Sequence, residues 1–246
     1  MKNIMILVGA WPNHIINELA LFDLIEKTFH GRIQKKDAFA FDTVIKNTKV
    51  TFQFCLGHDN DPIVNELKKQ TDAQIPPHIK TLAQKKLDID EVYYLGFCGH
   101  FKGGVNYVYV PHSFKKVIFN RHEITSRTPH KLIKRALKFK NLLHGKIGGT
   151  ECVSLTSNHV HSLRYATNNN ERELFLLGKK LGPHADVIER EGYEMVKLFG
   201  RKYPLGIAYY GTDSALEPHS LISTSRNQVD WNEFKKVSLD MIRAIT

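Results

Sequence analysis

Short apolar runs typical of buried strands alternate along this chain with longer stretches of helical periodicity. The chain opens with a buried strand at residues 3–9 and a helix capped by Asn13, and it ends with a strand at 205–210 and a helix at 231–245. Strands that alternate with helices form a sheet covered by helices, because each element must bury its apolar face. We therefore expect an α/β fold in one domain, residues 1–246, built as a three-layer sandwich.

A turn-like segment at 46–48 joins two of the predicted strands and indicates a β-hairpin, whose strands are antiparallel. The central sheet flanked by helices should therefore be mixed. The other predicted strands are 38–44, 49–56, 91–95, 105–110, 151–155 and 186–188. The other predicted helices are 62–69, 77–86, 130–144, 171–181 and a helix that follows the strand at 186–188 and ends at 199.

The net charge of +10 is concentrated in residues 113–140, which hold nine Lys or Arg residues against one acid, Glu123. Such a segment can attract nucleic acid, a membrane surface or a phosphorylated small molecule. The apolar positions of 130–144 recur on one side of a helix, which favours a simpler interpretation. We expect the lysines to form the solvated face of that helix, with neither nucleic acid nor a membrane as partner.

The first apolar run is too short to span a membrane, and no small-residue cleavage site follows it. The three cysteines, Cys55, Cys98 and Cys152, have no CxxC spacing. This argues against a disulfide framework and against a zinc site. We expect a cytoplasmic protein with reduced thiols, no metal and no cofactor.

Three polar or glycine-rich segments follow predicted strands: 96–104, 188–193 and 209–214. In α/β sheets the ligand crevice lies at the carboxyl ends of the strands. Glycines allow the backbone to approach a ligand closely, although a plain turn would explain them too. Glu189 and Glu191 precede a helix, whose dipole favours carboxylates, so Glu189 can also be a cap.

Together these segments resemble the nucleoside phosphorylase and nucleosidase family. Glu189-Arg190-Glu191 is similar to the Glu-Met-Glu signature of purine nucleoside phosphorylases and methylthioadenosine nucleosidases. Thr212-Asp213 resembles their Ser-Asp pair. The loop Gly96-Phe97-Cys98-Gly99 matches their glycine loop at both glycines. The resemblance implies a substrate site built from these three segments, with Glu189, Arg190 and Thr212 among its residues.

The resemblance also implies roles for two carboxyl groups. Glu191 would bind the ribose hydroxyls, and Asp213 would act as general acid at the purine N7. Cleavage of the N-glycosidic bond passes through a positively charged, oxocarbenium-like sugar, while the base leaves as a protonated or hydrogen-bonded purine. Because an ordinary Asp has a pKa of ~3.9, Asp213 must be buried to hold a proton near neutral pH. An ordinary turn or cap role for Asp213 remains the alternative.

The departures from the family bear on the nucleophile. The phosphorylases hold phosphate with an Arg and a Ser, and this chain has Tyr94 and Phe97 in those places. Hydrolysis is therefore favoured over phosphorolysis. His14 lies near the place of the water-activating Glu of the hydrolases and can serve as a catalytic base, or it is simply a first-turn histidine. The base pocket would include His159, Val160 and His161, where the family has a stacking Phe.

The sequence thus predicts an enzyme: a purine nucleosidase with a small nucleoside as substrate. A phosphorylase with phosphate as second substrate is one alternative. A member that has lost activity and binds a nucleotide or nucleic acid through the basic segment is another. The resemblance also implies a homo-oligomer.

Overall fold

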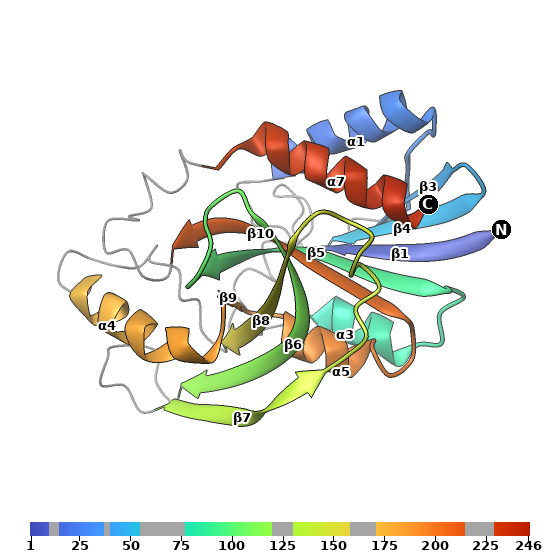
Figure 1. Ribbon diagram of the computed structural model, residues 1–246. Helices are drawn as coiled ribbons and strands as arrows, with labels where there is room; N and C mark the ends of the chain where they lie inside the picture. The colour runs from blue at the N-terminus through green and yellow to red at the C-terminus, as the bar shows by residue number, and fades with distance from the viewer. Residues whose placement is uncertain (10–14, 37–39, 55–76, 120–129, 158–170, 215–228) are drawn as a thin grey trace.

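The computed structural model describes residues 1–9, 15–36, 40–54, 77–119, 130–157, 171–214 and 229–246 (Figure 1). The strands are β1 (Lys2–Val8), β2 (Gln34–Lys35), β3 (Ala40–Ile45), β4 (Thr48–Phe54), β5 (Glu91–His100), β6 (Val108–Phe119), β7 (His130–Lys138), β8 (Thr150–Ser157), β9 (Val187–Glu189) and β10 (Leu205–Ser214). The helices are α1 (Ile15–Phe29), α3 (Pro77–Gln84), α4 (Glu171–Leu181), α5 (Gly192–Leu198) and α7 (Trp231–Ile245), with a 3-10 turn at Gly182–His184. The predicted helix at 62–69 and the predicted cap Asn13 lie outside these residues.

The strands form one mixed sheet, as predicted. β1 runs parallel to β4 and β5, and β5 runs parallel to β10, whereas β3 and β4 form the predicted antiparallel hairpin. At one end the sheet curls on itself, because β10 pairs with both β5 and β6 while β8 and β9 complete the circuit from β6 back to β5. This closure brings β9 and β10 to opposite sides of the carboxyl end of β5.

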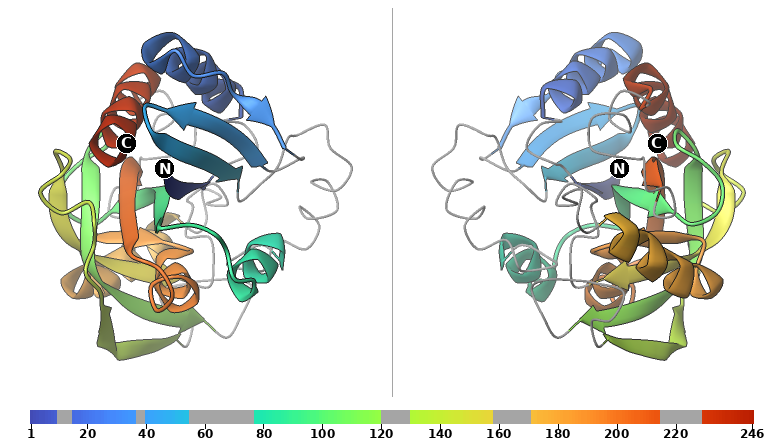
Figure 2. Two further views of the ribbon diagram at one scale, coloured as in Figure 1. Left: turned by 90° about the vertical axis from the view of Figure 1, so that its right-hand side faces the viewer. Right: turned by 90° about the vertical axis from the view of Figure 1, so that its left-hand side faces the viewer.

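Helices cover both faces of the sheet, with α1 and α7 on one face and α3 and α5 on the other (Figures 1 and 2). The side chains of β1 alternate between the two faces of the sheet and so contribute to the core under each helical layer. Ile4 and Ile6 belong to the core under α1 and α7, whereas Met5 and Leu7 belong to the core under α3 and α5. The expectation of a sheet between two helical layers is thus confirmed. Among the described helices, none is long and apolar enough to cross a membrane.

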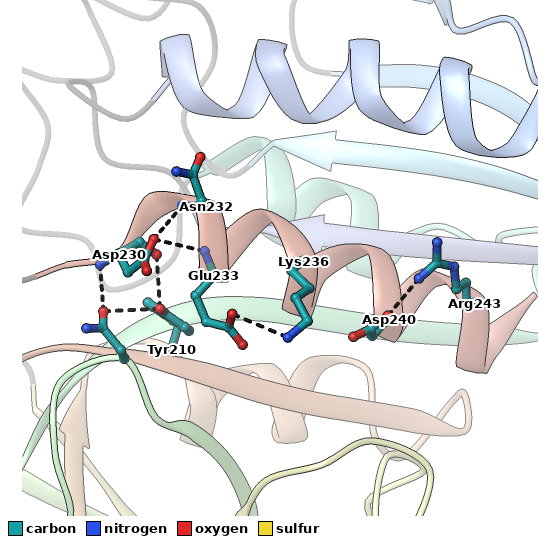
Figure 3. Close-up of polar contacts among 8 residues, drawn as sticks. Tyr210, Asp230, Asn232, Glu233, Lys236, Asp240 and Arg243 are labelled. Atoms are coloured by element: carbon teal, nitrogen blue, oxygen red, sulfur yellow. Dashed lines mark hydrogen bonds and ion pairs between the residues drawn. The ribbon is translucent and has the colours of Figure 1, made fainter.

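Helix α7 begins where a polar network ties it to β10 (Figure 3). The Asp230 carboxylate caps the helix by accepting hydrogen bonds from the N–H groups of Asn232 and Glu233, at 2.9 and 3.1 Å. The Tyr210 hydroxyl of β10 lies 3.1 Å from two acceptors, the Asp230 carbonyl and Asn106 Oδ1, which share its single proton. An N-cap of this kind contributes about 1 kcal/mol, and here it also fixes the helix on the sheet.

The predicted helix at 130–144 is wrong: the segment forms strand β7, which pairs antiparallel with β6. The apolar residues recur four apart, which mimics a helix, but a β-bulge makes the same spacing fit a strand. The three residues of β6 from Phe114 to Lys116 lie opposite the five residues of β7 from Leu137 to Ile133. Leu137 packs against the core under α3 and α5, and Leu132 packs against a separate apolar cluster. Lys131, Arg135 and Lys138 are exposed on this edge strand, where charge discourages association between sheet edges.

The predicted turn at 96–104 is also shorter than expected, because β5 continues to His100. The following strand, β6, starts three residues later than predicted and extends to Phe119. The glycines Gly96 and Gly99 are thus strand residues that pair with β10, and Gly99 also pairs with β9.

Candidate active site

The three segments singled out in the sequence meet at the carboxyl end of β5. Gly99 pairs with Ile188 of β9 on one side and with Asp213 of β10 on the other. A β-bulge between Gly211 and Asp213 leaves Thr212 as the extra residue, and its hydroxyl donates to the Cys98 carbonyl at 3.4 Å. The side chain of Asp213 lies outside the described part of the structure. The sheet register thus places the backbone of Asp213 beside Gly99, with β9, which ends at Glu189, on the other side of that glycine.

Glu189 is buried at the end of β9, and its carboxylate holds the start of α5. Oε2 accepts hydrogen bonds from the backbone N–H groups of Glu191 and Gly192, both at 2.6 Å. Oε1 accepts from the hydroxyls of Thr156 and Ser154 of β8. Burial raises the pKa of Glu189, and these hydrogen bonds oppose that rise. The capping role considered for Glu189 is therefore what the structure shows.

Glu191 turns its carboxylate to a different partner. The hydroxyl of Tyr94 in β5 lies 3.3 Å from Glu191 Oε2 and donates to it. Burial, and then repulsion from the Glu189 carboxylate, raise the pKa of Glu191 to about 7, although the charge of Arg190 and the Tyr94 hydroxyl lower it. Glu191 therefore has a perturbed carboxyl group at the strand ends, as functional carboxyl groups often do.

Tyr94 fills the corner between β1 and β5, and two glycines make room for it. A Cβ on Gly9 would lie 2.6 Å from the Tyr94 hydroxyl oxygen, and one on Gly96 would lie 2.7 Å from its ring. Gly96 is thus explained by the packing of Tyr94, which the sequence treated only as a departure from the family. Any residue larger than glycine at either position would displace the Tyr94 phenol.

Tyr209 of β10 completes the cluster from the other side. Its ring meets the Tyr94 ring edge to face, with 5.9 Å between centroids, and its side chain is fully buried. A Cβ on Gly192 would lie 2.2 Å from the Tyr209 hydroxyl oxygen, so α5 packs directly on this ring. Burial, followed by the nearby Glu189 carboxylate, raises the pKa of Tyr209 well above its ordinary value. Tyr209 is therefore a neutral phenol at neutral pH.

The remaining predicted site residues are distributed differently. Cys98 lies on the same face of β5 as Tyr94, whereas Phe97 points to the other face and packs against Phe234 of α7 at 5.2 Å between ring centroids. His14, His159, Val160 and His161 lie outside the described residues. Among the residues that are described, no three His, Cys, Asp or Glu side chains gather as metal ligands do.

Sequence reasoning missed Thr156, Ser154 and Tyr209 as neighbours of the two glutamates. The signal for Ser154 and Thr156 was their place on either side of the apolar Leu155: buried polar groups need hydrogen-bond partners. Tyr209 gave no comparable signal, because an aromatic residue in a buried strand is ordinary core material.

No protein-family model and no curated protein matches this sequence. Solved structures do match it. A 5'-methylthioadenosine/S-adenosylhomocysteine nucleosidase from Helicobacter pylori, with butyl-thio-DADMe-Immucillin-A, has a TM-score of 0.62 at 15% identity, over 100% of this chain and 98% of that chain. A mutant of futalosine hydrolase from Helicobacter pylori has a TM-score of 0.57 at 16% identity, over 99% of both chains.

A nucleosidase of the same name from Chlamydia trachomatis gives a TM-score of 0.55 at 13% identity, over 100% of this chain and 96% of that chain. At such low identities the likeness establishes the fold, and it extends over essentially the full length of each chain. The protein thus has the fold of the nucleoside phosphorylase and nucleosidase family.

Proposed function

We propose that this protein is a nucleosidase that hydrolyses the N-glycosidic bond of a purine nucleoside. The observation that carries the proposal is the Glu191 carboxyl group, which burial and the nearby Glu189 carboxylate perturb and which accepts a hydrogen bond from Tyr94 of β5. The full-length fold match to enzymes named as nucleosidases supports the same reaction class.

In the proposed reaction Glu191 binds the sugar. When ionised, its carboxylate accepts hydrogen bonds from the 2′ and 3′ hydroxyls, and hydrogen bonds to a charged acceptor are strong. Its negative charge also stabilises the positive charge that develops at the anomeric carbon as the bond to the base breaks. Because the pKa of Glu191 is about 7, the sugar-binding form becomes dominant only above neutral pH.

Asp213 is the proposed general acid. It donates a proton to N7 of the purine so that the base leaves as a neutral molecule, and water then attacks the anomeric carbon. The bulge that precedes Asp213 in β10 allows a side chain to be redirected at the strand end. An acid that must remain protonated near neutral pH needs a raised pKa, which burial would supply.

We infer water rather than phosphate as the nucleophile. The groups that face Glu191 in the described structure are Glu189, Tyr94 and Tyr209, with Arg190 as the adjacent cation. The resemblance places a phosphate-binding Arg of the phosphorylases at position 94, and here the uncharged phenol of Tyr94 fills the corner between Gly9 and Gly96 instead. We retain His14 as the proposed base that activates the water.

The test measures release of free base from a panel of purine and pyrimidine nucleosides, with and without phosphate. The wild type is compared with Asp213→Asn and with a matched control, Asp230→Asn, which changes a carboxylate that caps α7. Loss of a general acid lowers kcat by about 10²- to 10⁴-fold. We expect phosphate-independent turnover in the wild type and the control, lost in Asp213→Asn. Strict phosphate dependence would refute hydrolysis, and a silent wild type would refute the enzyme.

A further inference from the structure

The hydrogen bond between Tyr94 and Glu191 joins residues of two different elements at the strand ends. Tyr94 lies in the middle of β5, whereas Glu191 begins α5. The 3.3 Å separation places the phenol as a donor to Oε2, one of the two oxygens that would accept hydrogen bonds from a sugar. Because the carboxylate is planar, the group that binds Oε2 also fixes the direction of Oε1.

The Tyr94 side chain is itself rigidly held. It is 1% exposed, it meets Tyr209 edge to face, and Gly9 and Gly96 close the space around its ring. A phenol in such a slot cannot change rotamer without displacing backbone, because it packs on the main chain of Gly9, just after β1, and of Gly96 in its own strand. It therefore offers Glu191 a donor in a fixed position.

Glu191 needs such a donor because its other neighbours do not favour a carboxylate in this place. The charged and titratable groups that face it in the described structure are Glu189 of β9, the adjacent Arg190, Tyr94 of β5 and Tyr209 of β10. Glu189 repels it, and Glu189 has its own oxygens occupied by Thr156, Ser154 and the start of α5.

We propose that Tyr94 is a positioning residue for Glu191, whose phenol orients the Glu191 carboxylate as a charged acceptor for the sugar hydroxyls. The inference rests on the proposed function and deepens it. In this hydrogen bond the Tyr94 hydroxyl is the donor and the Glu191 carboxylate is the acceptor. A donor to the charged form favours ionisation of the carboxyl group.

The sharpest test compares Tyr94→Phe with Tyr93→Phe. Tyr93 directly precedes Tyr94 in β5 and is equally buried. Its hydroxyl donates to a different carboxylate, that of Glu91, at 2.5 Å. Both variants thus lose one buried phenol hydroxyl bonded to a glutamate, but only Tyr94→Phe touches the proposed site. Thermal melts of both variants measure the structural cost of losing the hydroxyl.

Loss of the Tyr94 hydroxyl removes a hydrogen bond to the ionised carboxylate, so the pKa of Glu191 should rise. The acid limb of the kcat/KM profile should move to higher pH by about one unit. At pH 7 the ionised fraction of Glu191 would fall from about a half to about a tenth, a roughly five-fold loss in kcat/KM that appears mainly in KM. Tyr93→Phe should keep the profile of the wild type.

The titration of Glu191 can also be followed directly by its carboxyl carbon in NMR spectra of glutamate-labelled protein, with Glu191→Gln to assign the signal. An upward shift of this titration in Tyr94→Phe alone supports the inference. An unchanged titration and an unchanged acid limb overturn it, even if the enzyme is active. If the wild type releases no base, the proposed function fails, and the NMR titration still decides whether Tyr94 controls Glu191.

Discussion

Replacing Glu191 by glutamine should stabilise the protein at pH 8 while removing the proposed sugar ligand. The pKa of Glu191 is about 7 in the folded chain against an ordinary 4.5. Between these values the folded state binds the proton more tightly than the unfolded state, so the free energy of unfolding falls as pH rises. The difference between the two pKa values corresponds to a loss of at most about 3 kcal/mol in the free energy of unfolding above pH 7, and partial exposure of the carboxyl group reduces this loss. We expect Glu191→Gln to gain about 1–3 kcal/mol at pH 8 and little at pH 5.

Urea denaturation of the wild type and the variant at pH 5 and pH 8 measures this difference. Glu91 provides a control because its pKa shifts in the opposite direction. Burial raises the pKa of Glu91, but hydrogen bonds from Lys2 and Tyr93 outweigh burial and hold that pKa below its ordinary value. Stability from Glu91 is therefore present above its unfolded pKa, and Glu91→Gln should be less stable than wild type at pH 8. A Glu191→Gln variant that is less stable at pH 8, or equally changed at both pH values, would refute the reasoning.

Two further predictions concern packing. Asn141 is buried, donates at 2.8 Å to the Ile207 carbonyl and accepts at 3.0 Å from the Ile207 N–H. Asn141→Leu should therefore lower the free energy of unfolding in urea titrations by about 3 kcal/mol. An unchanged stability would contradict the role of Asn141 in holding β10. Gly96→Ala should lower the free energy of unfolding by about 1–3 kcal/mol, because the new methyl group overpacks against Tyr94, and it should also reduce activity. The control is Gly148→Ala, whose new Cβ meets nothing within 4 Å and which should leave stability unchanged in the same titrations.

The helical and strand content was largely readable from local sequence. Helix α4 covers the predicted residues 171–181, and α7 covers the predicted 231–245. The hairpin of β3 and β4 followed from its short turn. In these segments the periodicity, the turn residues and the packing agree, so the local pattern determines the element.

Strand β7 shows where that reasoning fails. Its lysines and apolar residues satisfy a helix as well as a bulged strand, and local sequence cannot distinguish the two. The decision came from β6, which pairs with β7 and places the buried Phe114 opposite Leu137. Tertiary context overrode propensity, as it often does for short amphipathic segments.

The candidate site divides in the same way. The sequence by itself determined which residue types are present at the strand ends: two glutamates before a helix, glycines at 96 and 99, and Asp213 after a buried strand. Only the tertiary structure decided that Tyr94, nearly a hundred residues before Glu191, donates to its carboxylate. The physical reason is that local periodicity fixes each element separately, whereas the closure of β5 between β9 and β10 fixes which side chains meet.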